Sequence, residues 1–117
     1  MYLTATRPDI MFAVGVLLRF LSCASELHMI AATRVIRYLK GTVTFGIKFT
    51  KGNQFNLCGF TDSDWASCVE DMRSTSGYCF TVGSGCFSWS SKKQEVVAQS
   101  TAEAEFMAAT AAANQAI

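Results

Sequence analysis

The sequence lacks an apolar run long enough to cross a bilayer. Its longest run, residues 10–18, has nine residues and ends at Arg19, whereas a membrane-spanning helix needs roughly 20. The first nine residues include Asp9 and no basic cluster ahead of the apolar stretch, which argues against a signal peptide. We therefore expect no membrane partner and an intracellular, cytoplasmic protein, with an organelle or the nucleus left open.

Paired metal-binding cysteines are also missing. The chain has five cysteines, an odd number, and no Cys-x-x-Cys pair. This pattern predicts neither a disulfide framework nor a zinc ribbon, so we expect small thiols in the core or at the surface. The single histidine, His28, has no nucleophile or metal ligand next to it in sequence. We expect it on the face of a helix.

Net charge is small but unevenly distributed. The formal charge of +1 argues against a strongly basic nucleic-acid binder. Residues 1–51 nevertheless carry seven basic and two acidic side chains, whereas residues 52–117 carry three basic and seven acidic ones. Such asymmetry fits a basic half that lies on phosphates and an acidic half that holds cations. It equally fits two solvated faces of opposite sign.

The first third of the chain has the pattern of two helices. Pro8 and Asp9 suit a helix start, and apolar residues then recur at helical spacing, which predicts a helix over residues 8–21. A second helix is predicted from Ser25 as its N-cap to Gly41 as its stop. We expect these helices to form a hairpin.

The chain after Thr42 has the pattern of strands followed by one helix. Strands are predicted at residues 44–49, 55–62, 76–82 and 86–91. Gly83 and Ser84 suit a two-residue type II′ turn, which would place Phe80 opposite Phe87 and Tyr78 opposite Trp89 on one face.

The last helix is predicted to begin at a capping box formed by Ser100 and Glu103 and to run through the alanine-rich end of the chain. Together with the strands and the helical hairpin, this element makes the expected fold class α+β.

Four acidic residues are candidates for metal chemistry. Asp62 and Asp64 lie two residues apart at the end of a predicted strand, so extended backbone would place both on one face. Glu103 and Glu105 open the last helix. Mg²⁺ is commonly held by one or two carboxylates with waters and phosphates, which makes this set a candidate magnesium site. The alternative is that Asp ends strands and Glu caps helices.

Five basic residues are candidates for nucleic-acid binding. Two lie on the second predicted helix, two follow the strand that contains Trp89, and one precedes Pro8. They are Arg7, Arg34, Arg37, Lys92 and Lys93. Ordinary solvated helix faces and lysines that blunt a strand edge are the competing interpretations.

Six ordered blocks carry a family resemblance that covers essentially the whole chain. They are residues 2–10 (YLTATRPDI), 37–42 (RYLKGT), 59–66 (GFTDSDWA), 73–78 (RSTSGY), 91–94 (SKKQ) and 100–106 (STAEAEF). In this order they resemble the end of a copia-type retrotransposon polyprotein. The resemblance implies that residues 1–43 are a helical hairpin from the end of the reverse-transcriptase region, and that residues 44–117 are a truncated RNase H-like domain.

The resemblance also assigns roles to residues. It implies that Asp62 and Glu105 are catalytic metal ligands, with Asp64 and Glu103 in reserve, in a nuclease that uses two Mg²⁺ ions to hydrolyse the RNA of an RNA:DNA hybrid. Two positions depart from the family pattern: Ala24 stands where proline is usual, and Ser67 where glycine is frequent. Neither departure removes a ligand.

The family draws further acids from beyond its first helix, and this sequence stops at Ile117. The remainder of the polyprotein is missing from it. We therefore expect a fragment of a nuclease that is inactive alone and binds Mg²⁺ weakly or not at all. The alternatives are a non-catalytic nucleic-acid-binding module, acting through the five basic residues above, and an expressed relic without function.

Overall fold

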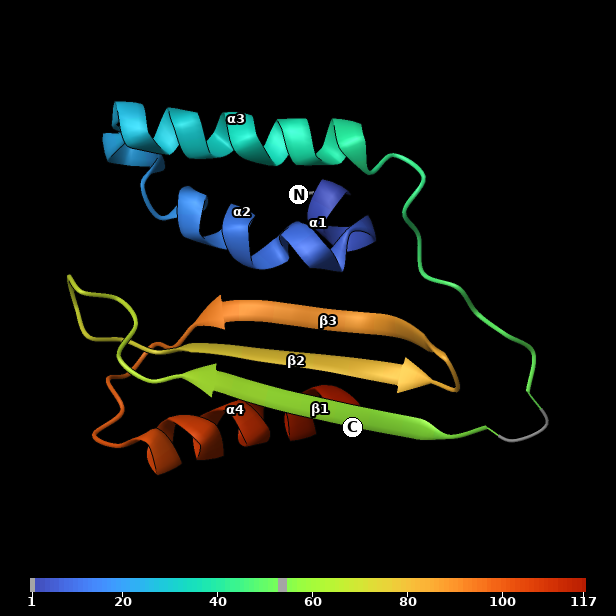
Figure 1. Ribbon diagram of the computed structural model, residues 1–117. Coiled ribbons are helices and arrows are strands. Elements are labelled where there is room, and N and C mark those ends of the chain that lie inside the picture. Colours follow the sequence, from blue (N-terminus) through green and yellow to red (C-terminus); the bar gives the residue numbers. More distant parts are fainter. Residues whose placement is uncertain (1, 53–54) are drawn as a thin grey trace. The chain divides into compact units, whose positions relative to one another are not determined.

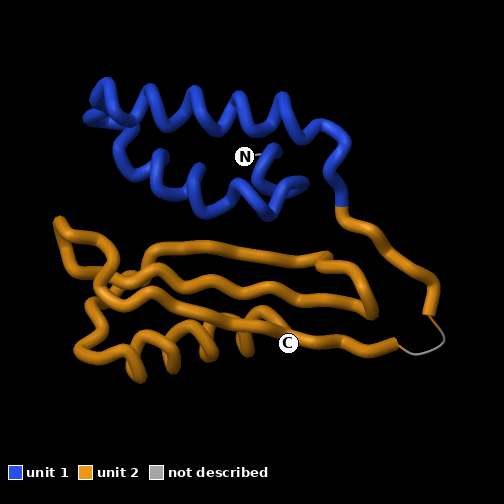
Figure 2. The backbone as a smooth tube through the Cα atoms, in the orientation of Figure 1, with its two compact units in different colours: residues 1–46 blue, residues 47–117 orange. Residues whose placement is uncertain are grey.

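The protein is described by a computed structural model that covers residues 2–52 and 55–117. The chain divides into two compact units, Met1–Gly46 (unit 1) and Ile47–Ile117 (unit 2), which Figure 2 colours separately. The predicted boundary, between residues 43 and 44, lies close to this division. The α+β class is confirmed, because helices precede a three-stranded antiparallel sheet and another helix follows it.

Unit 1 contains the predicted helical hairpin with additional short turns. The first predicted helix is split into a 3-10 turn, η1 (Pro8–Ile10), and α2 (Met11–Leu18). A short helix that the sequence pattern did not reveal, α1 (Tyr2–Thr6), precedes them, and the 3-10 turn η2 (Leu21–Cys23) follows. The second helix, α3 (Glu26–Gly41), begins after Ser25, as predicted.

His28 has a local structural role. Its Nδ1 accepts a hydrogen bond from the backbone N–H of Ser25 at 3.0 Å, so His28 completes the capping box of α3. Its ring also stacks on Phe20, with the centroids 4.3 Å apart. These contacts satisfy an orphan donor at the start of the helix and support the prediction of a histidine on a helix face.

Unit 2 is a sheet with one helix packed on it (Figure 1). Its strands are β1 (Leu57–Asp64), β2 (Thr75–Val82) and β3 (Gly85–Lys93), arranged in the order β1-β2-β3 with both pairs antiparallel. The helix α4 (Thr101–Ala116) contacts β1 and β2. Within the part of the chain that the structure describes, β1 and β3 are therefore the outer strands.

The predicted strand at residues 44–49 is wrong. No strand is assigned between Gly41 and Leu57 among the described residues. Instead, the backbone N–H of Thr50 donates to Ser84 Oγ at 3.0 Å, and Ser84 Oγ donates to the carbonyl of Lys48 at 3.4 Å. The polar groups of this segment thus find partners in a hydroxyl at the hairpin turn, so the β-branched and aromatic composition of the segment was misleading.

The predicted register of the β2–β3 hairpin is also wrong, although its turn is correct. Val82 pairs with Gly85 across Gly83 and Ser84, and Gly83 has a φ of +56°. A bulge then shifts the ladder by one residue. As a result, Phe80 pairs with Ser88 rather than Phe87, and Tyr78 with Ser90 rather than Trp89.

Alanines set the distance between α4 and the sheet. Ala104, Ala108 and Ala112 recur every four residues and are buried. Their small side chains let the helix backbone lie close to the strands, and side-chain hydrogen bonds hold it there. Tyr78 Oη donates to Gln115 Oε1 at 3.2 Å, and Gln94 Nε2 donates to the carbonyl of Ala104 at 3.0 Å. The rotation of α4 about its own axis is therefore fixed.

No helix in the described ranges, 2–52 and 55–117, combines the length and the apolar character that a membrane span requires.

Candidate functional site

One open cavity lies between the end of β1 and the first turns of α4. It has a volume of about 460 Å³, and six residues line it: Thr61, Asp62, Ala102, Glu105, Phe106 and Ala109. The four helical residues have the spacing of a single stripe along α4. This stripe lies beside the buried alanine stripe, so the packing of the alanines places Glu105 and Phe106 toward β1.

The cavity contains the two leading sequence candidates. Asp62 comes from β1, where it pairs with Gly77, and Glu105 comes from the first turns of α4. Both residues are exposed. Asp62 Oδ1 accepts a hydrogen bond from the N–H of Ser63 at 2.9 Å, which orients its carboxylate. Among the described residues, neither carboxylate forms an ion pair within 4 Å, so both keep oxygen atoms for a ligand.

The two reserve candidates have structural partners instead. Asp64 Oδ1 accepts a hydrogen bond from the backbone N–H of Thr75, at the start of β2. Glu103 Oε2 accepts from the N–H of Gln99 at 2.7 Å, while the N–H of Glu103 donates to Ser100 Oγ at 3.2 Å. Glu103 therefore caps α4, although its carboxylate reaches Gln99 rather than Ser100. Neither reserve acid lines the cavity.

Several residues that the sequence analysis did not assign a role hold the end of β1 next to the segment before α4. Ser74 is fully buried; its Oγ accepts from the N–H of Ala66 and its carbonyl from the N–H of Gln94. Trp65 Nε1 donates to the carbonyl of Ala98 at 3.1 Å. These bonds connect the end of β1 with the segment that leads into α4. All but Ala98 lie in the blocks that carry the family resemblance, which was the available signal.

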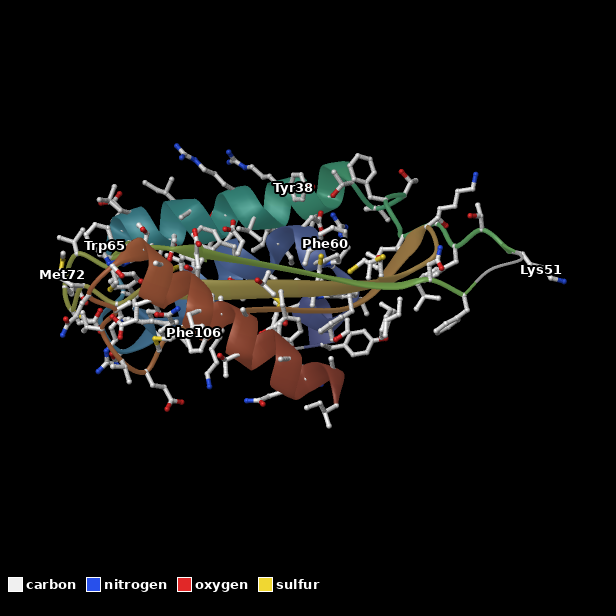
Figure 3. All side chains as sticks on the ribbon, turned by 90° about the horizontal axis from the view of Figure 1, so that it is seen from below. Tyr38, Lys51, Phe60, Trp65, Met72 and Phe106 are labelled. Carbon is white, nitrogen blue, oxygen red and sulfur yellow. The ribbon has the colours of Figure 1, made fainter. Side chains whose placement is uncertain are left out.

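An ion pair closes the loop between β1 and β2. Lys93 Nζ lies 2.6 Å from Asp71 Oδ2 and 3.2 Å from Cys68 Sγ. The hydrogen bond from Lys93 lowers the pKa of Asp71 to about 2. Trp65 and Met72 lie at the same end of unit 2, where β1 enters this loop (Figure 3).

The structure gives the predicted basic residues different surroundings. Arg7 pairs with Asp9 at 2.7 Å, with only 14% of its side chain exposed, and Lys93 pairs with Asp71. Lys92 is 78% exposed in its side chain and lies 3.5 Å from Glu95. Arg34 and Arg37 are exposed on α3.

The five basic residues are also divided between the two units of the chain. Arg7, Arg34 and Arg37 belong to unit 1, whereas Lys92 and Lys93 belong to unit 2. A nucleic-acid contact through these five residues stays a prediction.

A cation at the cavity would have few protein ligands. In the described part of the chain, no group of three or more His, Cys, Asp or Glu side chains is placed to hold a metal ion. Two carboxylates with free oxygen atoms do fit the donor set of one Mg²⁺ ion, which prefers oxygen and keeps several waters. The residues therefore fit one weakly held ion better than a pair.

Similar proteins place the chain in a family. It is 49% identical to the protein called secreted RxLR effector protein 161 of Plasmopara viticola, over all of this chain and 83% of that protein. It is 46% identical to the retrovirus-related Pol polyprotein from transposon RE1 of Arabidopsis thaliana, over 90% of this chain. It is 44% identical to the corresponding polyprotein from transposon TNT 1-94 of Nicotiana tabacum, over 92% of this chain.

The chain spans only 7% of the RE1 polyprotein and 8% of the TNT 1-94 polyprotein. No protein-family model matches it, and no solved structure matches it. These identities, over 90% or more of this chain, confirm the family resemblance that the six sequence blocks carry. This chain therefore belongs to the family of retrovirus-related Pol polyproteins from copia-type transposons, as a segment of such a polyprotein.

Proposed function

We propose that unit 2 is the beginning of an RNase H-type nuclease domain, in which Asp62 and Glu105 bind a divalent cation used to cleave the RNA strand of an RNA:DNA hybrid. One observation carries this proposal. Asp62 and Glu105 are far apart in sequence yet line one open cavity, whereas Asp64 and Glu103 accept backbone hydrogen bonds elsewhere. The Pol polyprotein relatives support it, because the chain is a segment of such polyproteins.

The chemistry of the site follows from its two carboxylates. A bound Mg²⁺ would supply charge stabilisation and an activated water for phosphodiester hydrolysis. Asp62 would hold it from β1 and Glu105 from α4. Ala102 and Ala109, on the same stripe of α4, have small side chains that leave the cavity open beside these two residues.

The 117-residue chain should be inactive by itself. A two-ion mechanism places four positive charges in one site, and Asp62 and Glu105 supply only two negative ones. No third acidic, histidine or cysteine ligand joins them among residues 2–52 and 55–117. Further carboxylates are therefore needed, and we propose that a longer segment of the polyprotein supplies them.

A cleavage assay on a labelled RNA:DNA hybrid tests this proposal. The 117-residue chain is compared, in Mg²⁺ and in Mn²⁺, with a chain extended by the polyprotein segment that follows α4. We expect cleavage only by the extended chain, and its loss in Asp62→Asn and in Glu105→Gln. Glu95→Gln is the matched control, because the side chain of Glu95 is 86% exposed and lies outside the cavity.

Three outcomes would contradict the proposal. Cleavage by the extended chain that survives Asp62→Asn and Glu105→Gln would show that the site is misassigned. Cleavage by the short chain that disappears in Asp62→Asn would show that two carboxylates suffice. Binding of the hybrid that weakens with salt and does not respond to Mg²⁺, without any cleavage, would favour the non-catalytic nucleic-acid-binding alternative.

A further inference from the structure

A short segment of unit 2, residues 48–51 (KFTK), is hydrogen-bonded to the β2–β3 turn, and we refer to it as the strap. The backbone N–H of Thr50 donates to Ser84 Oγ at 3.0 Å, and the hydroxyl oxygens of Thr50 and Ser84 are 2.7 Å apart. Ser84 Oγ also donates to the carbonyl of Lys48 at 3.4 Å. These bonds lie on both sides of Phe49, so they fix the backbone that carries its ring.

The ring of Phe49 lies flat on Gly85. A Cβ at Gly85 would be 2.3 Å from both Cδ1 and Cε1 of the ring and 2.8 Å from Cγ. A group beside the ring edge cannot be this close to all three atoms, so Gly85 meets the face of the ring. Gly85 is buried there, whereas Phe49 is 59% exposed. The opposite face of the ring is therefore open to a ligand.

The strap also carries two lysines, Lys48 and Lys51. Both are exposed, and Lys51 extends away from the sheet (Figure 3). Among the described residues, neither lysine forms an ion pair within 4 Å. The sequence has no acidic residue between Glu26 and Asp62. Both ammonium groups are therefore available to an anionic ligand.

The acids of unit 2 gather at the other end of the sheet. They lie at the end of β1, in the loop after it, in the segment after β3 and in the first turns of α4. The first of them, Asp62, pairs with Gly77, and the turn at Gly83 is six residues further along the chain. At roughly 3.4 Å per residue this separation is about 20 Å, well beyond the ~8 Å over which exposed charges interact at physiological salt. A polyanion at the strap therefore avoids the repulsion of these carboxylates.

We propose that the strap is a binding site for single-stranded nucleic acid. One base stacks on the open face of Phe49, and Lys48 and Lys51 contact the phosphates on either side of it. Sites of this class combine basic side chains with aromatic rings, because each nucleotide has one charge and one flat base. A duplex presents base edges and phosphates but keeps the base faces in its stack. The strap should therefore bind an unpaired strand more tightly than a duplex.

The same residue types occur at membrane surfaces, but the geometry favours a nucleic acid. Segments that lie on a membrane are commonly amphipathic helices that bury an apolar face in the lipid. The strap has no helical turn, and the ring of Phe49 lies against the protein instead of projecting from it. The site uses neither Asp62 nor Glu105, so it does not rest on the nuclease function proposed above and is measured without Mg²⁺.

Fluorescence anisotropy of labelled twelve-nucleotide RNA and DNA strands measures the affinity. Phe49→Ala should weaken binding at least about fivefold, because stacking of one base on an aromatic ring contributes at least that much. Phe49→Trp should keep the affinity. The matched control is Phe45→Ala, because Phe45 precedes the strap and is 61% exposed. RNA and DNA strands should respond alike, since the proposed contacts involve the base and the phosphates but not the sugar.

The salt dependence of binding tests the two lysines. Lys48→Gln and Lys51→Gln should each reduce the slope of log affinity against log salt by about 0.7, the value for one phosphate contact on a single strand. Lys40→Gln, at an exposed position of α3, should leave the slope unchanged.

A double-mutant cycle tests how the ring is held. A methyl group at Gly85 would displace the ring of Phe49, so Gly85→Ala should weaken binding in the wild-type chain. It should cause no further loss in Phe49→Ala, because no ring is left to displace. A further loss of similar size in that background would show that Gly85 does not act through Phe49 and would contradict the stacking geometry.

Photochemical crosslinking uses the wild-type chain and does not depend on variants that fold. A strand that contains 5-iodouracil is irradiated on the protein, and trypsin then releases residues 49–51, in which Phe49 is the only aromatic residue. We expect the crosslink on this peptide. A crosslink found only elsewhere, equal affinity of wild type and Phe49→Ala, or an equal loss in Phe45→Ala would overturn the proposal. Binding to phosphatidylserine vesicles that requires Phe49, without binding of either strand, would overturn it in favour of a membrane surface.

Discussion

The guanidinium of Arg7 donates hydrogen bonds to both the carbonyl oxygen of Thr42, at 3.1 Å, and its hydroxyl, at 2.7 Å. It also contacts both carboxylate oxygens of Asp9, at 3.0 and 2.7 Å. Tyr38 Oη donates to the same carboxylate at 2.8 Å. This network connects the start of unit 1 to the end of α3. Arg7 therefore has a structural role in unit 1, beyond the nucleic-acid contact predicted from its charge.

Replacing Arg7 by lysine should destabilise unit 1 although the positive charge is kept. Lysine cannot reproduce the planar fork that contacts Asp9 and Thr42 together. We expect Tm to fall by roughly 4–8 °C, the shift that the loss of one ordinary hydrogen bond causes in a small domain. Thermal unfolding by circular dichroism measures this change. Arg34→Lys, at an exposed position of α3, should leave Tm unchanged. Equal Tm values for Arg7→Lys and wild type would show that the hydrogen bonds of Arg7 do not stabilise unit 1.

Acid should weaken the loop between β1 and β2 through Asp71. The hydrogen bond from Lys93 lowers the pKa of Asp71 from 3.8 to about 2. Because the pKa is lower in the folded state, this group stabilises the fold above about pH 4, and the contribution disappears as pH falls toward 2. Asp9 titrates over the same window, since Arg7 lowers its pKa to about 2.

A carboxyl-carbon NMR titration should therefore place the midpoint of Asp71 near pH 2. In Lys93→Gln the midpoint should return toward 3.8, because the main cause of the shift is removed. In Asp71→Asn, stability should depend less on pH between 4 and 2, with the dependence due to Asp9 remaining. An Asp71 midpoint that does not change in Lys93→Gln would show that the ion pair is not formed in solution.

Adding a methyl group at Gly59 should disturb the sheet. A Cβ there would lie 2.7 Å from Cε1 and 3.1 Å from Cδ1 of Phe80, which is itself buried. We expect Gly59→Ala to lower the free energy of unfolding by about 1–3 kcal/mol, as overpacking commonly does. Gly46→Ala is the control, because a Cβ at Gly46 meets no atom within 4 Å. Urea denaturation compares the two. Similar stability of both variants would mean that Phe80 can move aside without cost.

The sequence predicted those elements that local signals specify. Ser25 and Gly41 mark the ends of α3, and Gly83 marks the β2–β3 turn, because caps and tight turns depend on a few adjacent residues. The predicted register of the β2–β3 hairpin was wrong because of the bulge between the two strands. An extra residue in one strand changes all pairs beyond it, and no local feature of β3 indicated where it would occur.

The candidate site was predictable in part. Asp62 and Glu105 were two of four acidic candidates in the sequence, and the family resemblance ranked them first; the structure places both at one cavity. The hydrogen bonds that occupy Asp64 and Glu103 depend on Thr75 and Gln99, and the order of acids along the chain could not reveal them. The contacts of Ser74 and Gln94 are likewise tertiary, and small polar residues give no periodic signal.

The distinction between leading and reserve acids gives the last prediction, a comparison of four variants in a Mn²⁺ titration followed by water relaxation. We expect one weak ion site in the 117-residue chain. Asp62→Asn and Glu105→Gln should each reduce its affinity by roughly tenfold or more, since loss of even an outer-shell partner costs 10- to 100-fold. Their unfolding should be unchanged, because both side chains are exposed.

The two reserve variants should behave in the opposite way. Asp64→Ala removes the acceptor of the Thr75 N–H, and Glu103→Ala removes that of the Gln99 N–H, so each should lower the free energy of unfolding by about 0.5–1.5 kcal/mol. Their Mn²⁺ affinity, measured where the protein is fully folded, should match that of wild type. If Asp64→Ala weakens Mn²⁺ binding as much as Asp62→Asn does, the ion lies nearer to the end of β1 than the cavity indicates. If none of the four variants changes the affinity, the cavity is not an ion site, and the divalent cation must be bound through residues outside Asp62 and Glu105.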